Sequence, residues 1–342
     1  MKTDIMNLSI KELEQYLEQL GEKRYRARQI FSWIYKGVEK FDDMANLPKE
    51  LRNKLDENAE LKKLKVLNIQ KSKKDGTRKY LFELRDGNSI ESVFMKYKFG
   101  NTVCISSQAG CLMGCRFCAS TINGLQRNLT AGEMSDQVIS IERDTEEKIS
   151  NIVVMGTGEP FNNYENLSKF LRNIHEKEGL NVGMRNITVS TCGLIKKMLE
   201  FAKDFPQVNL AVSLHAPNDT IRNKIMPINK RYPLEELLAV SRTYVAKTGR
   251  RITFEYALVK GINDGEQNAK ELAERLRGIN CHVNLIPLNQ VKETGLHGTE
   301  RKESELFREV LERHGIQVTI RRELGSDIDA ACGQLRLKSI TN

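Results

Sequence analysis

The chain has 342 residues, with 54 Lys and Arg against 45 Asp and Glu and a net charge of +9. This length allows one large domain with a smaller one beside it, and the positive excess suits a polyanionic partner, although charge alone does not establish one. Seven cysteines, an odd number with three close together, argue against a disulfide framework. Because no apolar run approaches the roughly 20 residues of a membrane span, we expect a cytoplasmic protein with no membrane partner.

Residues 1–60 are predicted to form a small helical domain. Ser9 and Glu12 make a capping box for its first helix, and Gly21 fits the position just after the helix ends. Two further helices are expected before residue 60. The basic run at residues 23–28 suggests phosphate binding, so we assign this domain to RNA, although such a run is more often a solvated helix face.

Residues 61–96 change to alternating apolar and polar residues, interrupted by turn sequences at 74–76 and 86–88. This pattern predicts a β-meander linker with Glu91 on its third strand. From residue 97 to 331, apolar strands alternate with helical segments, which indicates an α/β core with parallel strands. Six strands fit an open, partial (β/α)6 barrel and are too few for a closed eight-stranded one; we place them at 102–107, 151–156, 186–191, 208–214, 251–258 and 281–288.

The most informative segment contains Cys111, Cys115 and Cys118, spaced C-x3-C-x2-C. Cysteine thiolates are the usual ligands of iron–sulfur clusters, and three of them would leave one iron of a [4Fe–4S] cluster open. A structural zinc site is the alternative, with Cys104 as a possible fourth ligand. The spacing resembles the signature of the radical S-adenosylmethionine (SAM) superfamily, which implies a radical SAM core. In that superfamily, SAM binds the open iron and supplies radical chemistry after one-electron reduction.

Several further residues fall at the carboxyl ends of the predicted strands, where ligands bind in parallel α/β folds. A glycine-rich turn containing Gly158 and Glu159 resembles the motif that holds the SAM amino group in this superfamily, with the glycines letting the backbone approach a ligand. A structural role is the alternative for the turn and for the histidine of this set. The candidate SAM-binding residues are Gly158, Glu159, Ser190, Ser213, Leu214, His215 and Asn289.

Motifs along nearly the whole chain resemble those of the RlmN family of dual-specificity RNA methyltransferases. Thr157 departs from the family's more usual Met in the glycine turn. The matching segments are 111–121, 127–133, 155–160, 208–218, 226–229 and 327–335.

The resemblance implies methylation of carbon 2 of adenine, in the peptidyl transferase centre of large-subunit rRNA and 3′ of the anticodon in tRNAs. It implies two SAM per turnover: one methylates Cys332, in the tail 332–342, and the other activates that methyl group for addition to RNA. Glu91 would remove the ring proton, and Cys104 would attack the Cys332 sulfur, forming a disulfide and releasing the product. An electron donor such as flavodoxin or ferredoxin and a monomeric state are also expected.

Two alternatives remain at this point. A related family methylates carbon 8 of the same rRNA adenosine and shares the cysteine set, although residues 254–258 look more like the carbon-2 enzymes. The other alternative is a zinc-stabilised RNA-binding protein without catalysis. The remaining cysteines, Cys192 and Cys281, are expected to be small buried apolar residues.

Overall fold

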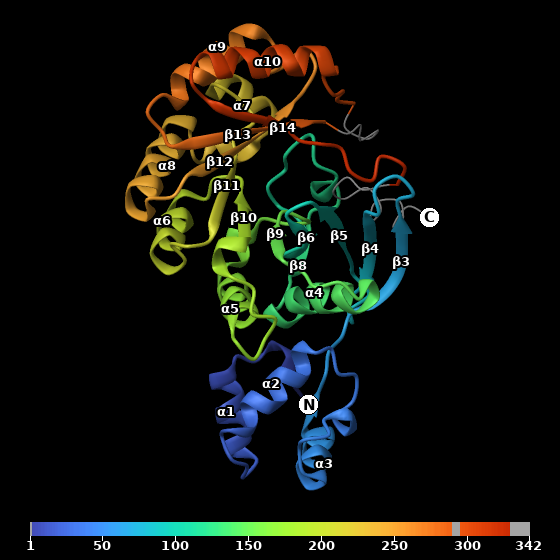
Figure 1. Ribbon diagram of the computed structural model, residues 1–342. Helices are drawn as coiled ribbons and strands as arrows, with labels where there is room; N and C mark the ends of the chain where they lie inside the picture. Colours follow the sequence, from blue (N-terminus) through green and yellow to red (C-terminus); the bar gives the residue numbers. More distant parts are fainter. Residues whose placement is uncertain (1, 289–294, 329–342) are drawn as a thin grey trace.

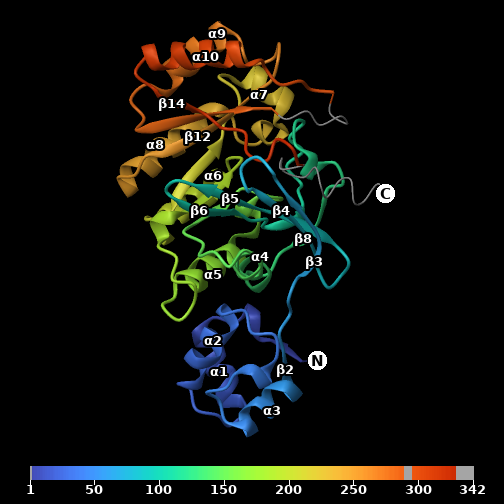
Figure 2. The ribbon, with the colours of Figure 1, turned by 45° about the vertical axis from the view of Figure 1, so that its right-hand side comes forward.

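The computed structural model describes residues 2–288 and 295–328, and its centre is one ten-stranded sheet (Figure 1). The strands follow the order β14-β13-β12-β11-β10-β9-β6-β5-β4-β3, and within the described residues no pairing joins β3 to β14. The sheet is therefore open, as the sequence predicts, and its strands curve with helices on the outside (Figure 2).

The N-terminal region forms the predicted helical domain, at the end of the molecule remote from α9 and α10 (Figure 1). The Ser9–Glu12 capping box is present, and Gly21 has φ +75°, the left-handed conformation that glycine adopts most readily. Two arginines of the basic run form ion pairs within the protein: Arg24 pairs with Glu18, and Arg28 pairs with Glu178. The elements are β1 (Thr3–Asp4), η1 (Ile5–Asn7), α1 (Ile10–Gln19), α2 (Arg26–Tyr35), η2 (Phe41–Asp43), α3 (Lys49–Asn58) and β2 (Ala59–Glu60).

The meander consists of β3 (Lys65–Lys71), β4 (Arg78–Glu83) and β5 (Ser89–Tyr97). Strand β5 pairs antiparallel with β6 (Gly100–Cys104), so the meander continues the sheet of the core and does not stand apart from it. Most residues of β5 are buried on both faces of the sheet, and β5 is not an edge strand because it pairs with β4 and β6.

The remaining strands of the sheet run parallel to β6, each following a helical crossover. All six predicted strands are present, and β14 is an additional short edge strand. The first is shorter than predicted, ending at Cys104. After β6 the strands are β9 (Asn151–Val154), β10 (Ile187–Thr191), β11 (Asn209–Ser213), β12 (Ile252–Leu258), β13 (Cys281–Pro287) and β14 (Gln317–Ile320).

Helices cover the outer face of the parallel strands (Figure 1). In the described part of the chain, no helix is long and apolar enough to cross a membrane. The helices are α4 (Ala131–Thr145), α5 (Tyr164–His175), α6 (Ile195–Asp204), α7 (Asp219–Ile225), α8 (Leu234–Thr248), α9 (Glu266–Leu276) and α10 (Arg301–Arg313). Short helices and a hairpin connect them: β7 (Gln108–Gly110), η3 (Ala119–Thr121), β8 (Leu125–Asn128), η4 (Pro160–Asn163), η5 (Met184–Asn186) and η6 (Pro227–Lys230).

Candidate functional site

A cavity of about 340 Å³ lies at the carboxyl ends of the parallel strands and collects most of the predicted site residues. Leu214 is buried beside the cavity, outside the described residues that line it. Asn289 and Cys332 lie outside the described residues. The predicted residues that line the cavity are Glu91, Cys104, Cys111, Cys115, Cys118, Gly158, Glu159, Ser190, Ser213 and His215.

The loop that carries the three motif cysteines is held by backbone contacts. Gly114 has φ +67°, which a residue with a side chain would adopt only with strain. The Cys118 N–H donates to the Cys115 carbonyl at 3.0 Å, and the Thr121 hydroxyl donates to the Cys118 carbonyl at 2.9 Å. The Arg116 N–H donates to the Ile225 carbonyl at 2.9 Å, which fastens the loop to the end of α7.

Two of the motif thiols have raised pKa values, so their ionisation would require a cationic group to offset it. Burial raises the pKa of the Cys115 thiol, and Cys118 and Cys111 raise it further. Burial likewise raises the pKa of Cys118. In the described residues, no three or more His, Cys, Asp or Glu side chains are close enough together to hold a single metal ion. The donor chemistry fits a [4Fe–4S] cluster with Cys111, Cys115 and Cys118 as ligands.

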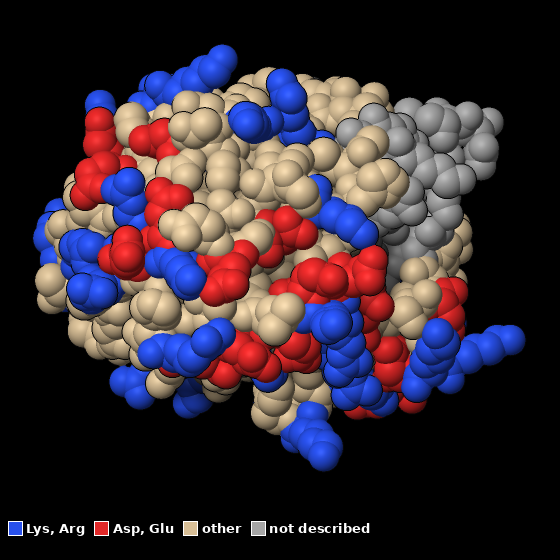
Figure 3. All heavy atoms as spheres, turned by 90° about the horizontal axis from the view of Figure 1, so that it is seen from above, with Lys and Arg blue, Asp and Glu red and all other residues tan. Residues whose placement is uncertain are grey.

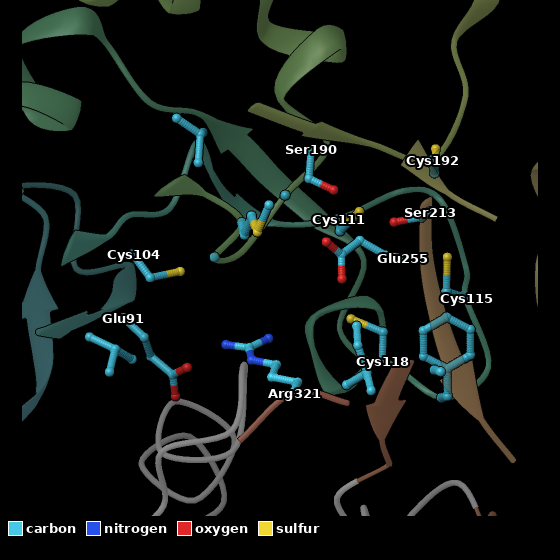
Figure 4. Close-up of a pocket in the computed structure, with 18 of the residues that line it drawn as sticks. Glu91, Cys104, Cys111, Cys115, Cys118, Ser190, Cys192, Ser213, Glu255 and Arg321 are labelled. Carbon is cyan, nitrogen blue, oxygen red and sulfur yellow. The ribbon is translucent and has the colours of Figure 1, made fainter. Parts of the chain in front are cut away.

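Cys104 lies on a different side of the cavity. Figure 4 shows Cys104 and Glu91 on the β5–β6 side, across from Cys115 and Cys118. Among the described cysteines, no disulfide is present.

The glycine-rich turn after β9 is required for packing against residues 105–108. A Cβ on Gly156 would lie 2.7 Å from the Ile105 carbonyl oxygen, and one on Gly158 would lie 2.6 Å from Gln108 Cβ. Gly158 also has φ +109°. We expected these glycines to let the backbone approach a ligand; the structure gives them a packing reason as well.

Glu159 is buried, and its carboxylate joins two strand ends. One oxygen accepts the Cys192 N–H at 2.7 Å, and the other accepts the Phe161 N–H at 3.0 Å. Burial raises the pKa of Glu159, while these N–H groups oppose that effect. Glu159 therefore holds the turn after β9 against the end of β10, in addition to any contact with a ligand amino group.

His215 is buried directly after β11, with φ +57°. Its Nδ1 accepts the Ala257 N–H at 2.9 Å, so this nitrogen carries no proton. Burial, with a contribution from the Arg222 guanidinium, lowers the pKa of His215 to about 3. The ring also meets Phe117 of the cysteine loop edge-on, with centroids 4.8 Å apart. His215 is therefore a neutral imidazole that joins β12 to the cysteine loop.

Sequence reasoning missed several charged residues at this site. Lys79 forms a buried ion pair with Glu91, and Arg222 is buried with its guanidinium bonded to the Ser213 and Leu214 carbonyls. Glu255 and Arg321 also line the cavity (Figure 4). A single charged position in the otherwise uncharged strand β12 was the available signal for Glu255, since a buried strand rarely carries an unpaired charge. Strand β4 also carries Arg78 and Glu83, so its sequence did not single out Lys79.

The chain that leads toward Cys332 is held against the β3–β4 turn. Asp327 accepts hydrogen bonds from the Ser72 hydroxyl at 2.6 Å and the Lys73 N–H at 2.8 Å. Asp75 accepts the Gly325 N–H at 2.8 Å, and although burial opposes it, this bond helps to lower the pKa of Asp75 to about 2. The meander therefore contacts the segment immediately before the predicted methyl-accepting tail.

The excess of Lys and Arg over Asp and Glu does not give a uniformly basic surface on the face seen from above in Figure 3. On the face seen in Figure 3, Lys and Arg side chains are interspersed with Asp and Glu. Any polyanion that binds there would meet charges of both signs.

Comparison with known proteins gives the same family along the whole chain. Residues 3–61 match the family model described as the ribosomal RNA large subunit methyltransferase N-terminal domain, and residues 105–273 match that of the radical SAM superfamily. A curated protein from Lachnospira eligens, a probable dual-specificity RNA methyltransferase RlmN, is 53% identical over 98% of this chain and 96% of its own. One of the same description from Clostridium novyi is 51% identical over 99% of each chain.

A solved structure agrees with these relatives. The crystal structure of a radical SAM methyltransferase from Sphaerobacter thermophilus is 47% identical, covers 97% of this chain and 98% of its own, and superposes with a TM-score of 0.93. Identity and coverage at this level extend over both the N-terminal domain and the barrel. The chain therefore belongs to the RlmN family of dual-specificity RNA methyltransferases, which are SAM-dependent enzymes of the radical SAM superfamily.

Proposed function

We propose that the enzyme methylates carbon 2 of adenine in large-subunit rRNA, at the peptidyl transferase centre, and in tRNAs, at the adenosine 3′ of the anticodon. One observation carries the proposal: a single cavity has the cysteine loop on one side and Cys104 with Glu91 on the other (Figure 4). A methyltransferase that only transferred an activated methyl group to a nucleophile would not need a second thiol and a buried carboxylate facing a cluster site.

The chemistry of the acceptor explains this division. Carbon 2 of adenine is an electrophilic, amidine-type carbon, so direct transfer of a methyl cation to it is unfavourable. The cluster and SAM, when bound, supply one-electron chemistry. Cys332 carries the methyl carbon and becomes joined to the base through it. Glu91 accepts the proton from carbon 2, and the adduct also loses its one unpaired electron. The Cys104 thiolate then attacks the Cys332 sulfur, so that a disulfide forms, the sulfur–carbon bond breaks with its electron pair going to carbon, and that carbon takes a proton from solvent to become the methyl group.

The cofactor requirement follows from the same scheme. One SAM methylates Cys332 and a second is bound at the cluster, so each turnover uses two. Ser190, Ser213 and His215 line the cavity with the cluster cysteines and are the candidates for contacts to SAM. An electron donor such as flavodoxin or ferredoxin reduces the cluster, an external thiol reductant resets the disulfide, and the enzyme acts as a monomer.

The test is mass spectrometry of adenosines from rRNA and tRNA incubated with the anaerobic holoenzyme, SAM and a reductant. We expect 2-methyladenosine at the two named positions. A methyl group at carbon 8 would assign the chain the activity of the related resistance enzymes. Colourless protein that holds zinc and transfers no methyl group would instead support the RNA-binding alternative.

We also propose that residues 1–60 bind RNA. This domain carries exposed basic side chains outside the ion pairs described above, including Lys23 and Lys36, and the Lys36 ammonium lies 5.3 Å from the centre of the Trp33 ring. Because the apolar residues of the domain are continuous with the main core, single substitutions are a cleaner test than truncation.

Replacing Lys23 and Lys36 by Ala should weaken RNA binding and lower the slope of log affinity against log salt by about 2. The matched control replaces Lys203 and Lys247, exposed lysines on α6 and α8, and should leave the slope unchanged. Equal slopes for both double variants would remove RNA binding from the N-terminal domain.

A further inference from the structure

Glu91 forms an ion pair with a buried lysine, Lys79, within the meander. Lys79 on β4 is fully buried, with a side-chain exposure of 0%, and its Nζ lies 3.0 Å from Oε2 of Glu91, whose side-chain exposure is 4%. Lys79 pairs with Val93 across the β4–β5 ladder and Leu81 pairs with Glu91, so the two charged side chains are diagonal neighbours on one face of the sheet. Glu91 and Val93 line the cavity, whereas Lys79 is outside the set of described residues that line it. The ammonium group therefore lies behind the carboxylate.

A buried ion pair of this kind is not explained by stability. Taking both charges out of water carries a large desolvation penalty, and well-packed apolar residues in place of such a pair are often equally stable or more so. In a buried site, a cation in contact with a carboxylate favours the charged form of that carboxylate, and the Lys79 ammonium is in contact with Glu91. The arrangement is therefore suited to keeping a buried carboxylate ready to accept a proton.

The cavity contains a second buried carboxyl group, Glu255, whose partners can be compared with those of Glu91. Glu255 on β12 is also buried, and its Oε2 accepts a hydrogen bond from the neutral Asn284 amide at 2.8 Å. Burial raises the pKa of Glu255, with Asn284 and Arg321 opposing it. Two carboxyl groups in one cavity thus have different contacting partners, an ammonium for Glu91 and an amide for Glu255. Different surroundings are how two carboxyl groups of one site come to have different roles.

We propose that Lys79 is a positioning residue that keeps the Glu91 carboxylate ionised and oriented to remove the proton from carbon 2 of adenine. This rests on the proposed function. In the step concerned, the carbon–hydrogen bond breaks, its electron pair stays on the ring and the proton goes to a Glu91 oxygen, so nothing is oxidised or reduced. Lys79 is not among the described residues that line the cavity, so its effect on the reaction would pass through Glu91.

The test compares Lys79→Met and Lys79→Arg with a control from the same hairpin. Lys65→Met removes an ion pair of the same length, since Lys65 Nζ lies 3.0 Å from Oε2 of Glu83, but that pair is solvent-exposed. Each holoenzyme, with Cys332 already methylated, reacts in a single turnover with a short RNA hairpin carrying the target adenosine. The hairpin is prepared with hydrogen or with deuterium at carbon 2.

For Lys79→Met we expect methylation at least about tenfold slower, with a primary isotope effect from deuterium at carbon 2 and unchanged RNA affinity, because proton removal becomes rate-limiting. Lys79→Arg, which keeps the charge, should recover most of the rate, and Lys65→Met should match the unmodified enzyme. A merely structural defect would slow the reaction without creating an isotope effect.

The inference is overturned if Lys79→Met methylates carbon 2 at the normal rate, or slowly with no isotope effect. If Lys79→Met does not fold, as judged by circular dichroism and iron content, Lys79→Gln takes its place, since Gln is uncharged and polar, and the same two results decide. Failure of the proposed function is distinguishable, because the unmodified enzyme would then place the methyl group elsewhere than carbon 2.

Discussion

Replacing Arg222 by Met should lower the free energy of unfolding of the barrel more than replacing an exposed arginine by Met. Arg222 is fully buried and makes four hydrogen bonds: to the carbonyl oxygens of Leu214 at 3.0 Å, Cys192 at 2.9 Å and Ser213 at 3.1 Å, and to Asn229 Oδ1 at 2.9 Å. Met fills similar space and leaves all four acceptors without this donor. At about 1–3 kcal/mol for each buried unsatisfied group, with some relief from relaxation, the loss is on the order of 4 kcal/mol.

The assay is urea unfolding of the cluster-free protein followed by far-ultraviolet circular dichroism. Fluorescence of the single Trp, Trp33, reports the N-terminal domain separately. With a slope of about 3 kcal/mol per M, the dichroism midpoint should fall by more than about 1 M. The control is Arg242→Met, since Arg242 also donates to two carbonyl oxygens, of Arg275 and Arg277, but is exposed. Equal midpoints for the two variants would refute the role of Arg222 in joining the strand ends.

Three further outcomes follow from the site and the core. Replacing any one of the predicted cluster ligands by Ala should strip iron, whereas Cys192→Ala, in the same cavity, should keep it; full iron retention would remove the assignment of Cys111, Cys115 and Cys118. Cys104→Ala should keep iron and accumulate a denaturation-resistant, nuclease-sensitive protein–RNA adduct, and normal turnover would exclude Cys104 from the mechanism. Burial raises the pKa of Asp136 to about 6, above its usual 3.8, so ionisation costs stability as pH rises through about 4–6. Asp136→Asn should therefore stabilise the protein by about 2–3 kcal/mol at pH 8 and by little at pH 4, and an equal gain at both pH values would contradict this cause.

Local sequence rules predicted much of the fold. The Ser9 capping box and the turn at residues 86–88 are decided within a few residues, so they could be identified from the chain alone. The alternation of strands and helices likewise predicted a parallel sheet. Strand β14 was missed because it is short and half-exposed at the sheet edge, which leaves little hydrophobic pattern.

The charged interior of the site could not be predicted in the same way. The contact between Lys79 and Glu91 depends on the register of two strands, and a one-residue shift would place them on opposite faces. Arg222 lies in the polar sequence of α7, where a solvated charge is the ordinary expectation; its burial is decided by η6 and the ends of β10 and β11. The motif residues, in contrast, could be placed on one rim because the carboxyl ends of parallel strands share an edge.

The central claim is that the methyl carbon reaches adenine through Cys332 and not directly from SAM. The most direct test supplies SAM whose methyl hydrogens are all deuterium and measures the mass of the methyladenosine over many turnovers. One hydrogen is removed from the methyl group on Cys332, and the carbon takes a proton from solvent when the sulfur–carbon bond breaks. We therefore predict a product methyl group that has exchanged one deuterium for hydrogen; an intact trideuterated methyl group would contradict the account.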